Sequence, residues 1–158
     1  MTVTSVETDY DKLTITLIAD FAAPVERVWE LWSDPRKLER WWGPPDYPTT
    51  FETLELTSGG AATYVMTGPN GTMRGEWRIA VVEPPTSLEF TDAFAGPDGR
   101  RIADVPFRVK VRLTEREPGT RMEMHLAFAS RADMEKLIST GIAEGLRQAA
   151  AQIDALLA

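Results

Sequence analysis

Few side chains in this sequence belong to the types that do chemistry. There is no cysteine, which excludes disulfides, thiolate zinc sites and a cysteine nucleophile. There is a single histidine, His125, so a metal ion would need carboxylates or water as its other ligands, and chemistry that needs two histidines is excluded. In its alternating segment His125 falls on the same side as Glu123, away from the apolar side, so we expect it at the surface. We expect neither a metal site nor a cofactor.

Asp92 and Tyr64 are the weak candidates for catalysis or for polar contacts with a ligand. Asp92 follows Leu88 and Phe90 in an alternating segment and therefore falls on their apolar side. A carboxyl group among apolar side chains needs partners or shifts its pKa upward. Two interpretations are open. Asp92 lies at the frayed, solvated end of a strand, or it joins Tyr64 to supply the few polar groups of a mostly apolar pocket.

The chain is instead rich in large side chains, with five Trp, six Phe, three Tyr and six Met among 158 residues. Its length and its 43% hydrophobic and 26% charged composition are typical of one globular domain, spanning residues 1–158. The 24 acidic residues outnumber the 17 basic ones, and the net charge of −7 argues against a nucleic-acid partner. No run approaches roughly 20 apolar residues, and the first seven residues have neither a basic nor an apolar region, so we expect no signal peptide. We expect no membrane insertion and, by default, a cytoplasmic protein.

Hydrophobic periodicity and turn residues divide the chain into strands and helices. Residues 13–21 alternate as a half-buried strand, and residues 24–33 and 35–42 follow with the spacing of two short helices. From about residue 49, six strands linked as a meander are separated by turns at 58–60, 68–71, 83–86, 96–99 and 117–119. Residues 131–157 repeat apolar residues at helical spacing, which predicts one long amphipathic helix.

The hairpin registers can be tested, because a slip of one residue moves every side chain of a strand to the other face. At four turns, one register gathers the apolar side chains on a single face. The predicted pairs are Leu113 with Met122, Val111 with Met124, Val109 with Leu126, Phe107 with Phe128, Val81 with Leu88, Ile79 with Phe90, Trp77 with Asp92, Met66 with Met73, and Tyr64 with Gly75, with Leu54 and Leu56 beside Tyr64 and Ala62. These patterns predict an α+β fold, in which a curved antiparallel sheet of about seven strands wraps around the long C-terminal helix, with two short helices after strand one. An exposed edge of this sheet could support a homodimer.

Two glycines inside the C-terminal helix need a reason, because each costs roughly 1 kcal/mol relative to alanine. Gly141, Gly145 and Ala149 recur every four residues and form a stripe beside Ile138 and Ile142. One interpretation is close approach of the helix to the sheet. The other is room for a ligand under the helix.

Several ordered motifs resemble those of the START-like (SRPBCC, Bet v allergen-like) superfamily. The motifs are Phe21-Ala22-Ala23-Pro24-Val25-Glu26-Arg27-Val28-Trp29, Asp34-Pro35, Trp41-Trp42-Gly43-Pro44, Gly59-Gly60, Pro69-Asn70-Gly71, Val82-Glu83-Pro84-Pro85, Leu88-Glu89-Phe90-Thr91 and the final stretch 141–157. Within the superfamily they are most similar to the branch named after activator of heat-shock-protein-90 ATPase homologues. The resemblance spans essentially the whole chain and implies a helix-grip fold with a hydrophobic cavity under the long helix.

The leading hypothesis for function is binding of a small hydrophobic or aromatic molecule between the sheet and the C-terminal helix. The superfamily also contains polyketide cyclases and aromatases and chaperone co-activators, so a cyclase-like enzyme and a chaperone-regulating module are the alternatives. A chaperone partner is doubtful, because the co-chaperone that names the branch carries an additional N-terminal domain. The residues expected to line the cavity are Trp42, Leu54, Tyr64, Met66, Trp77, Phe90, Asp92, Phe107, Val109, Met124, Ile138, Gly141, Ile142 and Gly145.

The Trp41-Trp42 pair admits two interpretations of its own. Both rings pack in the core, or the pair forms a wall at the mouth of the cavity. The second interpretation rests on the Gly43-Pro44-Pro45 loop that follows, because such a loop can hold aromatic rings at an opening.

Overall fold

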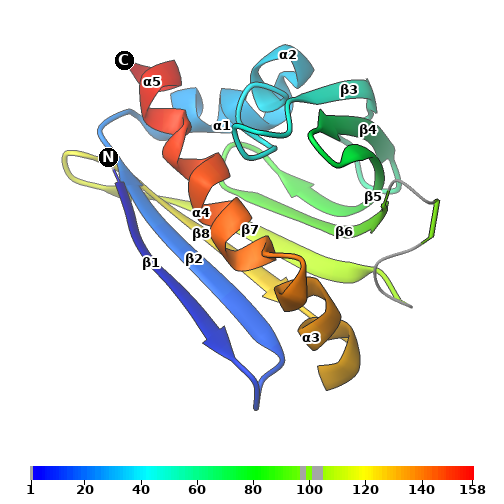
Figure 1. The fold of residues 1–158 in the computed structure, drawn as a ribbon. Coiled ribbons are helices and arrows are strands. Elements are labelled where there is room, and N and C mark those ends of the chain that lie inside the picture. The colour runs from blue at the N-terminus through cyan, green and yellow to red at the C-terminus, as the bar shows by residue number, and fades with distance from the viewer. Residues whose placement is uncertain (1, 97–98, 101–104) are drawn as a thin grey trace.

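A large antiparallel sheet is the main feature of a computed structural model of the protein, which describes residues 2–96, 99–100 and 105–158. The described residues form the strands β1 (Thr2–Asp9), β2 (Thr14–Phe21), β3 (Thr49–Leu54), β4 (Ala61–Gly68), β5 (Gly71–Glu83), β6 (Ser87–Ala95), β7 (Phe107–Arg116) and β8 (Gly119–Ala127). The helices are α1 (Val25–Ser33), α2 (Pro35–Leu38), α3 (Arg131–Ser139), α4 (Ile142–Ala151) and α5 (Ile153–Leu157). Figure 1 shows that the last three helices run across one face of the sheet. The predicted α+β class and helix-grip architecture are confirmed.

The strand order is β1-β2-β8-β7-β6-β5-β4-β3, so β3 to β8 form the predicted meander. The described sheet has one strand more than the expected seven, because β1 pairs with β2 at the edge. A shift in register between Val3 and Ser5 interrupts the alternation along β1, which explains why periodicity did not reveal it. Residues 97 and 98 of the predicted turn at 96–99 lie outside the described residues.

The predicted registers hold at the centres of the hairpins and fail at bulges. In β7 and β8, Leu113 lies opposite Met122 as predicted, and the next two apolar pairs follow in step. The pairing of Val81 with Leu88 is wrong, because an irregularity after Ile79 places Val82 opposite Leu88. Beyond it, the predicted pairs Ile79–Phe90 and Trp77–Asp92 are present. A one-residue bulge thus changed a local pair without moving the inner face of the sheet.

A second bulge changes the expected neighbours of β3. Leu54 lies opposite Ala62, and Phe51 rather than a leucine lies opposite Tyr64. The register shifts between Phe51 and Thr53, whereas the prediction assumed regular alternation back from the glycine turn. The aromatic ring of Phe51 therefore joins the inner face, where it is 1% exposed.

The C-terminal helix is divided rather than continuous. Gly141 has φ of +86°, in the left-handed region that L side chains rarely adopt, and it separates α3 from α4. The amides of Thr140 and Gly141 donate to the carbonyls of Leu137 and Ile138, which ends α3, and the Gly145 amide donates to the Gly141 carbonyl, which begins α4. Each segment can therefore follow its own part of the curved sheet.

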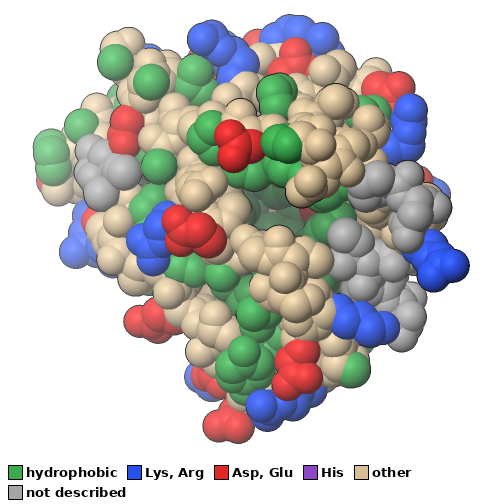
Figure 2. Space-filling view, viewed as in Figure 1, with side chains coloured by type: hydrophobic (Ala, Val, Ile, Leu, Met, Phe, Trp, Pro, Cys, Tyr) green, Lys and Arg blue, Asp and Glu red, His purple; other side chains and the backbone are tan. Residues whose placement is uncertain are grey.

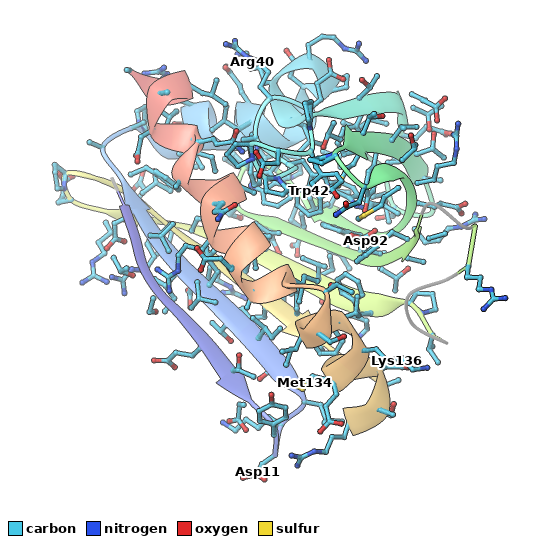
Figure 3. The ribbon with its side chains drawn as sticks, viewed as in Figure 1. Asp11, Arg40, Trp42, Asp92, Met134 and Lys136 are labelled. Carbon is cyan, nitrogen blue, oxygen red and sulfur yellow. The ribbon has the colours of Figure 1, made fainter. Side chains whose placement is uncertain are left out.

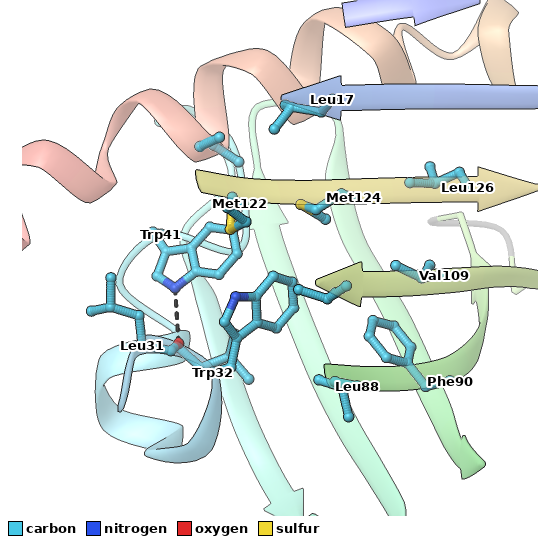
Figure 4. Packing of buried hydrophobic residues seen from close by; sticks show 14 of the residues in the cluster. Leu17, Leu31, Trp32, Trp41, Leu88, Phe90, Val109, Met122, Met124 and Leu126 are labelled. Atoms are coloured by element: carbon cyan, nitrogen blue, oxygen red, sulfur yellow. Dashed lines mark hydrogen bonds between the residues drawn. The ribbon is translucent and has the colours of Figure 1, made fainter. Parts of the chain in front are cut away.

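The core lies between the sheet and the helices and is dominated by rings. Trp77 stacks on Phe90 with ring centroids 4.0 Å apart, and Trp32 and Trp41 meet edge to face at 4.8 Å. Figure 4 shows side chains from β2, β8, β7 and β6 around the indoles of Trp32 and Trp41. The Trp41 indole N–H donates to the Leu31 carbonyl at 2.9 Å. The second short helix ends at Leu38, earlier than the predicted residue 42. No helix of the described residues is long and apolar enough to cross a bilayer.

Candidate functional site

A cavity of about 230 Å³ lies under the beginning of α4, between that helix and the inner face of the sheet. Figure 2 shows a hollow near the centre of this face of the molecule, with hydrophobic side chains inside it. The walls come from strands β4 to β8, from the loop after α2, and from the junction of α3 and α4. The lining residues are Trp42, Pro44, Tyr47, Tyr64, Met66, Met73, Asp92, Phe94, Phe107, Val109, Met124, Leu126, Thr140, Gly141, Ile142, Gly145 and Leu146.

Ten of the residues expected in a cavity are brought together around this one. They are Trp42, Tyr64, Met66, Asp92, Phe107, Val109, Met124, Gly141, Ile142 and Gly145. Trp77 and Phe90 do not line it, because they stack on each other in the core and are 0% and 1% exposed. Leu54 at the end of β3 and Ile138 on α3 also lie outside the lining.

Sequence reasoning missed seven lining residues, and three of these carried a usable signal. Met73 lies opposite Met66, Phe94 lies opposite Gly75, and Leu126 lies opposite Val109, so the predicted registers placed all three on the inner face. Pro44 and Tyr47 lie in a loop, where no periodicity shows which side chains turn inward. Thr140 and Leu146 lie on either side of the unpredicted helix break.

Asp92 and Tyr64 form a buried pair at the wall of the cavity. The Tyr64 hydroxyl lies 2.9 Å from one carboxylate oxygen of Asp92 and 3.1 Å from the other. Each residue is 3% exposed, so the interpretation of Asp92 as a solvated strand end is wrong. Figure 3 shows Asp92 and Trp42 near each other, beside α4.

Gly75 explains how a tyrosine on β4 reaches an aspartate on β6, two strands away. Tyr64 lies opposite Gly75 on the intervening strand β5. A Cβ atom built on Gly75 would lie 2.0 Å from Cζ of the Tyr64 ring, so the ring occupies the space that any other residue would fill. The missing side chain lets the ring cross β5 and bring its hydroxyl to the carboxylate.

The surroundings raise the pKa of both Asp92 and Tyr64. Burial raises the pKa of Asp92 from 3.8 to about 7, against the opposing effects of the Tyr64 hydroxyl, the Trp77 indole and the Ala93 backbone amide. Burial, followed by the charge of Asp92, raises the pKa of Tyr64 well above its usual range. The Trp42 and Trp77 indole N–H groups lie near the pair without reaching hydrogen-bond geometry. Near neutral pH, Asp92 is therefore divided between its protonated and ionised forms.

The two helix glycines leave open space rather than allowing close contact. A Cβ atom on Gly141 would meet no atom within 4 Å, and one on Gly145 would meet only Cγ of Pro44 at 4.0 Å. Close approach of helix to sheet is therefore wrong as the reason for these glycines. Gly141 supplies the backbone turn, and the absent side chain of Gly145 leaves room in the cavity.

The two adjacent tryptophans have different places. Trp41 is 0% exposed and belongs to the core, whereas Trp42 is half-buried and lines the cavity. The Trp42 ring meets Trp77 edge to face at 5.0 Å and Tyr64 at 6.3 Å. The core interpretation is thus right for the first ring, and the wall interpretation for the second.

His125 lies on the outer face of the sheet, as predicted. It lies opposite Lys110, its Nε2 is 3.7 Å from a Glu123 carboxylate oxygen, and its Nδ1 is 3.3 Å from the Thr16 hydroxyl. It is absent from the cavity lining. Within the described part of the chain, no three His, Cys, Asp or Glu residues are grouped so that they could hold a metal ion.

Comparison with solved structures gives close relatives over the full length. A solution NMR structure of a protein from Arthrobacter aurescens is 46% identical, over 99% of this chain and 92% of that one, with a TM-score of 0.92. A crystal structure from Mycobacterium smegmatis is 42% identical, over 99% of this chain and 97% of that one, with a TM-score of 0.90. The AHSA1 protein from Silicibacter pomeroyi shares the fold at 24% identity and a TM-score of 0.74, over 91% of this chain and 96% of that one. No curated protein matches the sequence significantly.

The family model gives the same assignment from sequence. The model described as Activator of Hsp90 ATPase homolog 1-like protein matches residues 22–158, which leaves β1 and β2 outside the match. The resemblance seen in the motifs is confirmed by this match and by the two structural relatives above 40% identity. The chain is a member of the Activator of Hsp90 ATPase homolog 1-like family, with its START-like fold.

Proposed function

We propose that the protein binds a small hydrophobic or aromatic molecule in the cavity between the sheet and α4. The observation that carries the proposal is the cavity itself, which is walled mainly by aromatic, aliphatic and methionine side chains and contains one buried polar pair. Small-molecule sites typically combine an apolar wall with a few well-placed polar groups. The START-like fold, which generally binds hydrophobic ligands, supports the same proposal.

The size of the cavity suggests the size of the ligand. An engineered apolar cavity of about 150 Å³ stays dry and holds benzene. A cavity of about 230 Å³ has room for a substituted benzene or two fused rings. Methionines at three points of the wall, Met66, Met73 and Met124, allow the lining to adapt to the outline of the ligand.

Filling the cavity from the helix side tests this proposal. We expect Gly145→Leu to weaken binding of two-ring aromatic compounds at least tenfold, because the new side chain enters the space under α4. Gly145→Ala is the matched control. It adds one carbon at ordinary contact distance from Pro44, should keep most of the affinity, and should raise the free energy of unfolding by up to roughly 1 kcal/mol.

The measurement is native mass spectrometry with a set of aromatic compounds, paired with thermal shifts. Ala151→Leu places the same side chain on the exposed side of α4 and should bind as the wild type does. The proposal is wrong if no compound of any class binds the wild type. It is also wrong if Gly145→Leu, correctly folded by circular dichroism, binds as tightly as Gly145→Ala.

A cyclase-like enzyme is the second candidate, and the Asp92–Tyr64 pair favours it. A carboxyl group with a pKa of about 7 beside a cavity can accept and return a proton at neutral pH. We expect Asp92→Asn and Tyr64→Phe to abolish conversion of a short poly-β-carbonyl compound while the fold is retained, with product detected by mass spectrometry. Glu123→Gln on the outer face is the control for charge. Undiminished conversion by Asp92→Asn would exclude this mechanism.

The family description names activation of a chaperone ATPase, which makes a chaperone-regulating role a separate question. Stimulation of that ATPase by the purified protein is the measurement that would add this activity to the proposal. We expect any such stimulation to be independent of the cavity, so the Gly145→Leu variant should stimulate the ATPase as the wild type does.

A further inference from the structure

Three side chains of the cavity wall, Tyr64, Asp92 and Thr140, present hydrogen-bond acceptors to a ligand. The Tyr64 hydroxyl directs its single proton to Asp92, so what it offers a ligand is an oxygen lone pair. The Asp92 carboxylate adds further lone pairs. The Thr140 hydroxyl donates to the Leu137 carbonyl at 2.6 Å and also presents its oxygen as an acceptor. A ligand that meets the Tyr64 oxygen or the ionised Asp92 carboxylate needs to bring the proton, whereas the unpaired indole N–H of Trp42 is the donor beside them.

The charges around the cavity also favour a ligand that donates a hydrogen bond or carries a positive charge. Among the lining residues that the structure describes, none is Lys, Arg or His, and Asp92 is the one carboxylate. The indole N–H groups of Trp42 and Trp77 lie near the pair but carry no net charge. The remaining polar lining residue, Tyr47, supplies a hydroxyl that can donate or accept. An anionic group brought next to Asp92 would find no cation on the described part of the wall to offset the repulsion.

We propose that this cavity selects a flat apolar molecule whose single polar end donates a hydrogen bond or carries a positive charge, and that it rejects carboxylates. This inference rests on the proposed function, since it names the chemical class that the same cavity takes. Phenols, aromatic alcohols and aryl-alkyl amines belong to the accepted class. Fatty acids and aromatic acids belong to the rejected class.

Aromatic rings in the wall add to the preference for a cation. Trp42, Tyr64, Phe94 and Phe107 line the cavity, and the negative face of an aromatic ring attracts a positive charge within about 6 Å of its centre. A protonated amine therefore meets the carboxylate at one point and ring faces around it. The same negative ring faces repel the negative charge of a carboxylate ligand.

Four probes with one skeleton separate head-group chemistry from apolar fit. They are naphthalene, 2-naphthol, 2-naphthylmethylamine and 2-naphthoate, titrated by isothermal calorimetry at pH 8, where Asp92 is mostly ionised. We expect the naphthol and the protonated amine to bind at least tenfold more tightly than naphthalene. We expect the naphthoate to bind at least tenfold more weakly than naphthalene.

Asp92→Asn assigns the discrimination to the carboxylate, because the amide keeps the shape of the side chain and an acceptor oxygen but removes the charge. In this variant the advantage of the amine over naphthalene should fall at least fivefold, and the penalty on the naphthoate should fall to less than threefold. Glu123→Gln removes one negative charge from the outer face and should leave the order of the four probes unchanged. Circular dichroism and the retained binding of naphthalene verify that each variant is folded.

The outcomes separate this inference from the proposal on which it rests. If all four probes bind with similar affinity, or the naphthoate binds best, the head-group inference is overturned while binding of a small apolar molecule stands. If none of the four binds to the wild type, both are overturned. A ranking that persists in Asp92→Asn also overturns the inference, because the charge would then not be its source.

Discussion

Asp92→Asn should leave the protein at least as stable as the wild type at pH 8, although it alters a buried hydrogen-bonded residue. In the unfolded chain the aspartate has a pKa near 3.8, and burial raises the pKa of the folded group to about 7. Between these values the folded protein holds a proton that the unfolded chain has lost. The resulting stability is fully present below pH 3.8 and is lost as the pH rises through 7. It amounts to on the order of 4 kcal/mol.

The measurement is urea unfolding of both proteins at several pH values from 5 to 8. The free energy of unfolding of the wild type minus that of Asp92→Asn should fall as the pH rises and reach zero or below at pH 8. Asp20→Asn is the control, and its difference from the wild type should stay constant across this pH range. The Arg121 guanidinium donates two hydrogen bonds, at 2.8 and 2.9 Å, to the Asp20 carboxylate and lowers its pKa, so the contribution of that carboxylate to stability is lost only as the pH falls below 3.8. Parallel pH profiles for wild type and Asp92→Asn would contradict the assignment of a raised pKa.

Gly75→Val is the second change for which we expect a large loss of stability, about 2–3 kcal/mol. The new Cβ would occupy the position of the Tyr64 ring, 2.0 Å from its Cζ atom. The Tyr64 ring cannot easily move aside, because the rings of Phe51 and Trp77 pack against it, with centroids 5.2 and 6.3 Å away. Displacing it would also remove the hydroxyl from Asp92.

A double-mutant cycle measures whether the cost comes from this contact. In a Tyr64→Ala background, Gly75→Val should cost much less than in the wild type, because the space above β5 is then empty. The free energies of unfolding of the four proteins give the coupling directly. Additive costs within about 0.5 kcal/mol would show that Gly75 matters for its backbone alone.

The parts of the fold that follow regular alternation could be predicted from the sequence. The register of β7 and β8 was correct because both faces carry a clear pattern, with Val111 and Met124 on one side and Lys110 and His125 on the other. Strand β1 was missed because its pairing shifts after Val3. The break at Gly141 was missed because apolar spacing continues across it and reports only which side faces the sheet.

For the candidate site, the sequence predicted which side chains face inward but not which of them touch. Alternation placed Tyr64 and Asp92 on the inner face, but their contact spans two strands and depends on the absent side chain at Gly75. That relation exists only once all three strands are in register. The loop residues Pro44 and Tyr47 carry no periodic signal, so only the folded chain shows that they complete the wall.

The break at Gly141 lets the first turns of α4, which cover the cavity, open without unfolding of the core. Helix α3 is anchored by Met134 and Leu137, at 0% and 1% exposure, and α4 is anchored at its far end by Ala149 and Ala150. Between these anchors, no residue of 142–148 is fully buried. Local opening costs least where few side chains are buried, so the first turns of α4 can unwind without exposing the tryptophan core. For the small molecule proposed above, entry and exit would then require unwinding of a short helical segment rather than of the whole fold.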